Sequence, residues 1–177
     1  MLENVLAQKK AAILDNWRQR LAQTYPADAA TFLRNEKDRF ANPVGHAIDQ
    51  ATEALIEYLQ HDSEMEQARP ALDKLLRIRA VQDFTPSQAV APLYVLKTVV
   101  REQLGEALDG VVDSDRVAGM LEMERFAQKV DQLALMAFDI YTACREQLAE
   151  VRIHEAKRAS EGLIERLNAS RRRETDK

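Results

Sequence analysis

The chain has 177 residues, 46% of them hydrophobic and 31% charged, and its formal net charge is -4 at pH 7. This balance is typical of a globular domain with its own core, and it excludes a disordered chain and a broadly basic surface for nucleic acid. The single cysteine, Cys144, favours a reducing compartment. Because the N-terminus carries scattered charges and no run of about 18 apolar residues occurs, we expect a cytoplasmic protein without membrane insertion.

Apolar residues recur three and four positions apart along the chain, which predicts an all-α fold, a single bundle of about six helices. The first predicted helix covers residues 3–25 and ends before Pro26. A short helix over residues 27–40 is expected to bury Phe32 and Leu33.

Proline marks the starts of the next two helices. Asn42 is a good N-cap, and Pro43 suits the first position of a helix that ends near residue 60. A fourth helix is predicted over residues 65–83, with Pro70 in its first turns.

The segment "FTPSQ" is the clearest helix start in the sequence. Thr85 is the predicted N-cap, Pro86 is the first helical residue, and Gln88 can close a capping box. The helix that follows is apolar nearly all round up to Val100, so we expect it to be the central buried helix, bent by Pro92.

A break with a cap at Ser114 is expected to precede one very long helix. Between Asp115 and Ser170 no proline occurs, and a continuous helix there would extend about 80 Å, farther than a globular core. Its first half is expected to pack on the domain through Leu121, Phe126, Val130, Leu133, Met136, Phe138, Ile140 and Tyr141.

The second half of this helix carries only a thin apolar seam, flanked by charge, with the spacing of a short coiled coil. We therefore divide the chain into a helical domain over residues 1–148 and a C-terminal helical stalk with a basic tail over residues 149–177. The stalk is expected to pair in a homodimer through Ala149, Ile153, Ala156, Leu163 and Leu167.

Signatures of chemistry are few. The histidines show no zinc-site spacing and no Glu-x-x-His pattern occurs, so neither a metal nor a cofactor is predicted. His46 could ligate haem in a helical pocket, but a polar residue near a helix start is the preferred interpretation. Cys144 is the redox candidate, since the neighbouring Arg145 could lower its pKa, although small cysteines also pack at helix interfaces. No phosphate loop or nucleophile motif occurs, so we do not expect an enzyme.

The stretch "RNEKDRF" places five charges in residues 34–40. On a helix, Arg34 and Asp38 would form an i, i+4 pair, and Glu36 would lie near Phe40. Composition alone favours an exposed helix end, stabilised by about 0.2–0.5 kcal/mol per pair.

Three segments, "FLRNEKDRFANPVG", "RIRAVQDFTPSQAVAPLYVLK" and "FDIYTACREQL", carry a resemblance to a known family. Together they resemble the RsbRD N-terminal domains, named after an RsbT co-antagonist of the bacterial stress-signalling complex, the stressosome. The resemblance spans roughly residues 5–155, and its most specific element runs from Phe32 to Gly45.

The resemblance implies a sensory or protein-interaction module with a broad likeness to non-haem globin-like sensor domains. Such a module usually precedes an output domain, either a phosphorylatable STAS domain or a histidine kinase. Only a short basic tail follows the stalk here, so we expect a stand-alone member without phosphotransfer of its own. Its expected partners are a second copy and an unidentified signalling or redox-complex protein.

The resemblance also selects candidate ligand-binding residues. One group can form either a polar site or a structural corner, and it consists of Glu36, Asp38, Arg39 and Asn42. A helix bend at Pro92 would bring a second group to it, namely Arg79, Gln82 and Lys97.

The expected function is therefore to relay a ligand or redox cue from the helical domain to a partner. Two alternatives stay open at this point: a sensor that binds a haem-type cofactor, and a ligand-free structural adaptor of a redox or sulfur-metabolism complex.

Overall fold

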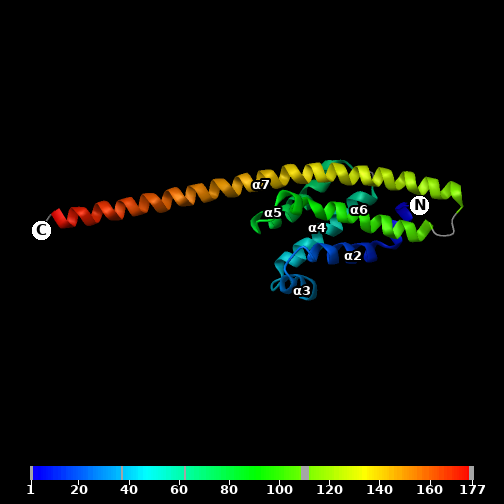
Figure 1. Cartoon of the computed structure of the whole chain (residues 1–177), viewed down its shortest axis with the longest axis horizontal. Coiled ribbons are helices and arrows are strands. Elements are labelled where there is room, and N and C mark those ends of the chain that lie inside the picture. The colour runs from blue at the N-terminus through cyan, green and yellow to red at the C-terminus, as the bar shows by residue number, and fades with distance from the viewer. Residues whose placement is uncertain (1, 37, 62, 109–111, 176–177) are drawn as a thin grey trace.

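The computed structural model describes residues 2–36, 38–61, 63–108 and 112–175, with side chains through Arg166. Within these ranges the chain forms seven α-helices, one 3-10 helix and no strand (Figure 1). The predicted all-α class with a long C-terminal helix is confirmed, whereas the likeness to globins stays a prediction. No helix in the described ranges combines the length and apolarity needed to cross a membrane.

Four helices make up the first third of the chain: α1 (Leu2–Gln8), α2 (Lys10–Ala22), α3 (Ala27–Asn35) and α4 (Pro43–Gln60). The single helix predicted over residues 3–25 is divided by one irregular residue, Lys9. Backbone hydrogen bonds from Lys9 to Val5 and from Ile13 to Lys9 lie on the two sides of this residue.

The prediction for residues 27–40 was wrong in two respects. Helix α3 ends at Asn35 and buries none of its residues, and Phe32 is 50% exposed. The physical reason is that Glu36 and Asp38 each accept a hydrogen bond from a backbone N–H two residues later, which replaces helical bonding with turns. The helical pair of Arg34 with Asp38 therefore does not form in this conformation.

A 3-10 turn, η1 (Met65–Ala68), leads into α5 (Arg69–Val81), and α6 (Pro86–Leu108) follows after a short turn. The predicted capping box at the start of α6 is confirmed: the Gln88 side chain accepts from the Thr85 N–H, and the Thr85 hydroxyl accepts from the Gln88 N–H. Helix α7 (Asp113–Thr175) begins one residue before Ser114, so the cap predicted at that residue was wrong.

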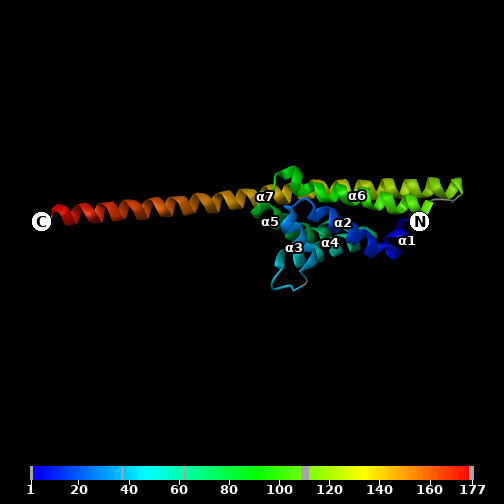
Figure 2. The same cartoon turned by 60° about the horizontal axis from the view of Figure 1, so that its bottom comes forward.

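The core lies between α1, α2, α4, α5, α6 and α7, and Trp17 is fully buried in it. Helix α6 buries eight of its 23 residues and Tyr94 is 50% exposed, so the prediction of a helix buried nearly all round was wrong: α6 has one buried face. It packs antiparallel to α7 (Figures 1 and 2). A smaller cluster of Leu21, Ile48, Ala51 and Leu75 joins α2, α4 and α5.

Helix α7 has two different environments along its length. Residues from Met123 to Cys144 contribute repeatedly to the core, but Leu121 and Phe138 are exposed, which corrects the prediction that they pack on the domain. Leu148 still packs against the core. Beyond it the residues described through Arg166 are exposed, except the half-buried Gly162. This part of α7 projects from the body as a rod (Figure 1).

Candidate functional site

The first group of predicted site residues forms the corner between α3 and α4. Asn42 is buried, and its side-chain oxygen accepts from the Gly45 N–H at 2.8 Å, which confirms the predicted N-cap of α4. Its side-chain nitrogen donates to the carbonyls of Leu33 and Glu36, each at 3.0 Å. One amide thus caps the end of α3 and the start of α4 at once, which favours a structural corner.

The charged members of the corner lie at its surface. Glu36 and Asp38 accept hydrogen bonds from the corner's own backbone, and the guanidinium of Arg39 lies over the Phe40 ring, 4.9 Å from its centroid. Phe40 itself is exposed. These contacts shape the loop, and none of the described ones reaches Arg79, Gln82 or Lys97.

Arg79 is the most unusual residue of the second group. It stands near the end of α5, is fully buried, and its Nη2 donates to the Thr24 hydroxyl at 2.8 Å. Its Nη1 donates to the Gln88 carbonyl at 2.9 Å. In a helix that carbonyl would accept from residue 92, which is proline and has no N–H. Arg79 therefore satisfies an oxygen of α6 that Pro92 leaves without its helical donor.

A second buried side chain bonds the backbone of α6 at Pro92 itself. The Pro92 carbonyl accepts a hydrogen bond of 2.7 Å from the Trp17 indole nitrogen. Two buried side chains, Trp17 from α2 and Arg79 from α5, thus bind the backbone of α6 around its proline. This arrangement fixes α6 between its neighbours and explains how an interior proline is tolerated.

Two aromatic rings enclose the Arg79 guanidinium. Its central carbon lies 4.4 Å from the Phe84 ring centroid and 5.6 Å from that of Tyr25, and the two rings meet edge to face at 5.1 Å. The Tyr25 hydroxyl donates to the Gln82 side-chain oxygen at 2.9 Å. Burial raises the pKa of Tyr25 and lowers the pKa of Arg79, but an arginine stays cationic at neutral pH.

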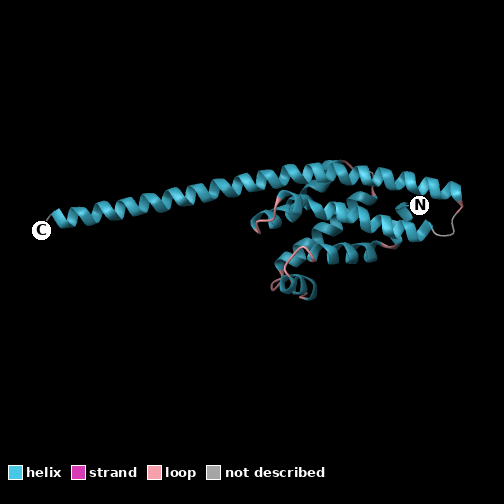
Figure 3. Cartoon of the chain, in the orientation of Figure 1, coloured by secondary structure: helices cyan, strands magenta, loops and turns pink. Residues whose placement is uncertain are grey.

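The turn between α5 and α6 holds this cage in place. The Phe84 N–H bonds the Arg79 carbonyl and the Asp83 N–H bonds the Ala80 carbonyl, which together make a Schellman motif. Asp83 occupies the position that needs a positive φ, here 57°. Figure 3 shows the turn as a loop at the end of the body from which α7 departs.

The same turn is bonded to α7. The Phe84 carbonyl accepts from the Tyr141 hydroxyl, and Arg145 Nη1 donates to the Ala80 carbonyl at 3.0 Å. The Asp83 carboxylate lies 2.6 Å from Arg145 Nη1 and 3.5 Å from Arg152 Nη2. Arg152 belongs to the exposed part of α7, so the turn reaches from the buried guanidinium to the base of the stalk.

Lys97 lies apart from the other members of its group. Its ammonium binds both carboxylate oxygens of Asp131 at 2.9 Å and so joins α6 to α7. The predicted ligand-binding residues therefore fall into three separate units. Arg79 and Gln82, both in contact with Tyr25, form one, the corner between α3 and α4 is the second, and Lys97 is the third.

Cys144 is buried on α7 beside an apolar cavity of about 270 Å³ that Arg77 also lines. Burial raises the pKa of its thiol, and the opposing effect of Arg77 is smaller. Arg145 is bonded to the α5–α6 turn and not to the thiol. A raised pKa favours the unreactive neutral thiol, so the geometry favours the packing role left open above.

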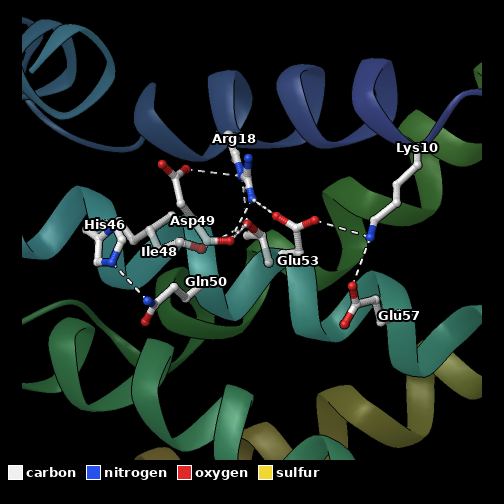
Figure 4. Close-up of polar contacts among 9 residues, drawn as sticks. Lys10, Arg18, His46, Ile48, Asp49, Gln50, Glu53 and Glu57 are labelled. Carbon is white, nitrogen blue, oxygen red and sulfur yellow. Dashed lines mark hydrogen bonds and ion pairs between the residues drawn. The ribbon is translucent and has the colours of Figure 1, made fainter. Parts of the chain in front are cut away.

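A set of contacts that the sequence did not reveal connects α2 to α4. Arg18 binds the Thr52 hydroxyl and the Asp49 carboxylate, and Lys10 lies between Glu53 and Glu57 (Figure 4). The bond to Lys10 is the main cause of a lowered pKa of Glu53. A cavity of about 590 Å³ beside Arg18 and Asp49 extends to α3. Every carboxylate drawn in Figure 4 has a cationic partner, which identifies this network as a clamp between helices.

The position of His46 favours the simpler interpretation, a polar residue near a helix start. His46 is exposed on α4 and lies 2.8 Å from the Gln50 amide (Figure 4). Among the described residues, no three His, Cys, Asp or Glu side chains gather in a way that could hold a metal ion.

The fold and these contacts define a helical module whose last helix continues from the core into an exposed rod. Residues 11–156 match the family described as the RsbT co-antagonist protein rsbRD N-terminal domain. The match covers most of the chain, and the chain belongs to this family, as the sequence motifs predicted. The family is one of regulatory input domains of the stressosome type. No curated protein and no solved structure matches the chain.

Proposed function

We propose that the chain is a cytoplasmic sensory module that acts as a homodimer and transmits its state to a partner protein through α7. The observation that carries the proposal is the continuity of α7, which packs on α5 and α6 and then continues as an exposed rod (Figure 1). A single rigid element shared by core and rod can transmit a change in core packing outward. The boundary that we propose between body and stalk is at residues 148 and 149.

The partner of the stalk seam is a second copy of this chain. Ile153 is 54% exposed and Leu163 is 60% exposed on a helix that touches no other described element there. An isolated helix of this kind is only marginally stable in water, so a paired helix is the expected state. Leu167 continues the seam by spacing, but its side chain lies outside the described part of the chain.

The exposed face continues toward the body, which favours a parallel pair. Leu135 and Phe138 are exposed, and they precede Ala149 by about four and three helical turns, so they lie on the face of the seam. A parallel pair would cover these two residues together with the seam. An antiparallel pair would place the two bodies at opposite ends and leave both residues uncovered.

Light scattering on the full chain after size-exclusion chromatography tests this proposal. We expect the mass of two chains for the natural sequence and the mass of one chain for the double variant Ile153→Glu, Leu163→Glu. The control is Arg158→Glu, which changes charge on the opposite side of the stalk and is expected to keep the mass of two chains. A single-chain mass for the natural sequence would refute the homodimer.

A further inference from the structure

The buried guanidinium of Arg79 has no charged partner among the described residues. Its two hydrogen bonds go to neutral oxygens, those of Thr24 and Gln88. Its Nε is buried and has no hydrogen-bond partner. Burying a cation without a counter-charge is costly, and an unsatisfied buried donor adds to that cost. The ring faces of Tyr25 and Phe84 over which the guanidinium lies compensate only in part.

A surface cavity lies on the outer side of the residues that contact this guanidinium. It has a volume of about 370 Å³ and is lined by Thr24, Tyr25, Pro26, Gln82, Asp83, Phe84 and Gln88. Four of these residues also contact Arg79 through a hydrogen bond or a ring face: Thr24, Tyr25, Phe84 and Gln88. One layer of side chains therefore separates the cavity from a buried positive charge.

We propose that this cavity binds a small carboxylate and that the carboxylate group binds the guanidinium of Arg79. The inference rests on the sensory role proposed above. A guanidinium edge matches a carboxylate in shape and charge. The Gln82 amide can donate a second bond, and the Tyr25 and Phe84 rings offer apolar contact to a short carbon chain. The Asp83 carboxylate at the rim disfavours dianions such as phosphate. The volume is near the lower limit for small-molecule pockets.

Entry of the carboxylate requires a movement of the cage. Arg79 has no exposed surface, so the Phe84 or Tyr25 ring must turn aside before an anion reaches Nε. The Phe84 carbonyl is bonded to Tyr141, and the adjacent Asp83 is bonded to Arg145 and close to Arg152. Entry past the Phe84 ring thus acts on the turn that connects the cage to the base of the stalk.

The test is an NMR titration of the uniformly ¹⁵N-labelled full chain that observes arginine Nε–H signals. Sodium acetate is the probe, sodium phosphate is the competing anion class, and sodium chloride matches the ionic strength. The Arg79 signal is identified by its loss in Arg79→Lys, and the exposed Arg77 provides the internal control. We expect a saturable shift of the Arg79 signal with acetate, and none with chloride.

If Arg79→Lys does not fold, the variant Gln82→Ala still tests the proposal. Gln82 is exposed, so its truncation does not affect the core. Loss of one hydrogen bond should weaken acetate binding by about two- to tenfold. No saturable shift, or an equal shift with chloride or phosphate, would overturn the carboxylate site. The mass measurement on the stalk requires no ligand, so failure here is distinguishable from failure of the proposed function.

Discussion

Asp83 and Arg145 are joined by a hydrogen bond of 2.6 Å between Oδ1 and Nη1, although one belongs to the α5–α6 turn and the other to α7. Asp83 takes this position only because its backbone adopts a positive φ at the end of α5. Arg145 lies just before the proposed boundary between body and stalk, and the same carboxylate lies 3.5 Å from Arg152, which lies just beyond it. The state of the turn and the position of the stalk are therefore linked by a contact that a single substitution can remove.

This bond should be visible in the titration of Asp83. Its hydrogen bond with Arg145 holds the pKa of the Asp83 carboxyl below its usual value, and Arg152 acts in the same direction. The pair therefore contributes stability above the unfolded pKa of about 3.9, and the contribution is lost as the pH falls through the lower folded value. A ¹³C carboxyl titration should show this depressed midpoint.

Arg145→Gln is the matched variant for the titration, since it keeps a long polar side chain and removes the charge. We expect the Asp83 midpoint to move back toward the usual value for an aspartate. An unchanged midpoint would mean that the bond does not exist in solution.

Gly45 should be intolerant of any side chain. A Cβ at this position would overlap the Asn42 amide, which is held by three hydrogen bonds. Gly45→Ala is expected to lower the free energy of unfolding by about 1–3 kcal/mol, because it breaks the double cap. The effect should be less than additive with Asn42→Ala, as measured by urea unfolding of the two variants and their combination.

Gly105 offers the control for that experiment. It lies in α6, and a Cβ added there would meet no other atom within 4 Å, so alanine adds helix propensity without a clash. Gly105→Ala should raise stability by about 0.5–1 kcal/mol. Equal effects of the two substitutions would contradict the double cap.

Truncation of Arg79 should be far more damaging than truncation of its neighbour on α5. Arg79→Ala leaves a cavity and deprives the Gln88 carbonyl of its donor, so the free energy of unfolding should fall by about 2–4 kcal/mol. Arg79→Met fills the space without burying a charge and should recover part of that loss. Arg77→Ala, at an exposed ion pair with Asp73, should leave urea unfolding nearly unchanged.

Cys144 should behave as an inert thiol. Because burial raises its pKa, the folded chain keeps the neutral thiol at pH values where an exposed cysteine begins to ionise. Its contribution to stability is complete below the unfolded pKa and is lost as the pH rises through the folded one. A disulfide reagent should label the native protein at pH 8 much more slowly than the protein in urea. Equal labelling rates of the native and the urea-unfolded protein would contradict this and would favour Cys144 as a redox-active thiol.

Local signals in the sequence were sufficient for much of the fold. The caps at Asn42 and Thr85 and the spacing of the core residues could be predicted because each depends on neighbours within one or two turns. The failure at Phe32 has the opposite cause. Helical spacing predicted an apolar face there, but α3 touches α2 and α4 without burying any of its own residues.

The candidate site was predictable only in part. Arg79 and Gln82 were selected through motif resemblance, but their partner Tyr25 lies far away in the sequence and is brought to them by the packing of α2 on the rest of the body. Lys97 was selected with them, yet its partner is Asp131. The sequence shows that Pro92 has no N–H to donate to the Gln88 carbonyl. That Arg79 donates to this carbonyl instead depends on tertiary structure.

The most direct test of the link between body and stalk is the rate at which two chains form a disulfide along the seam. Cysteine is introduced as Ile153→Cys or Leu163→Cys with Cys144→Ala, and each is compared with and without the turn variant Asp83→Asn, Tyr141→Phe. We predict that the turn variant slows cross-linking at residue 153, near the base of the stalk, and leaves the rate at residue 163 unchanged. Identical rates at residue 153 with and without the turn variant would contradict the account, because the stalk would then be independent of the turn.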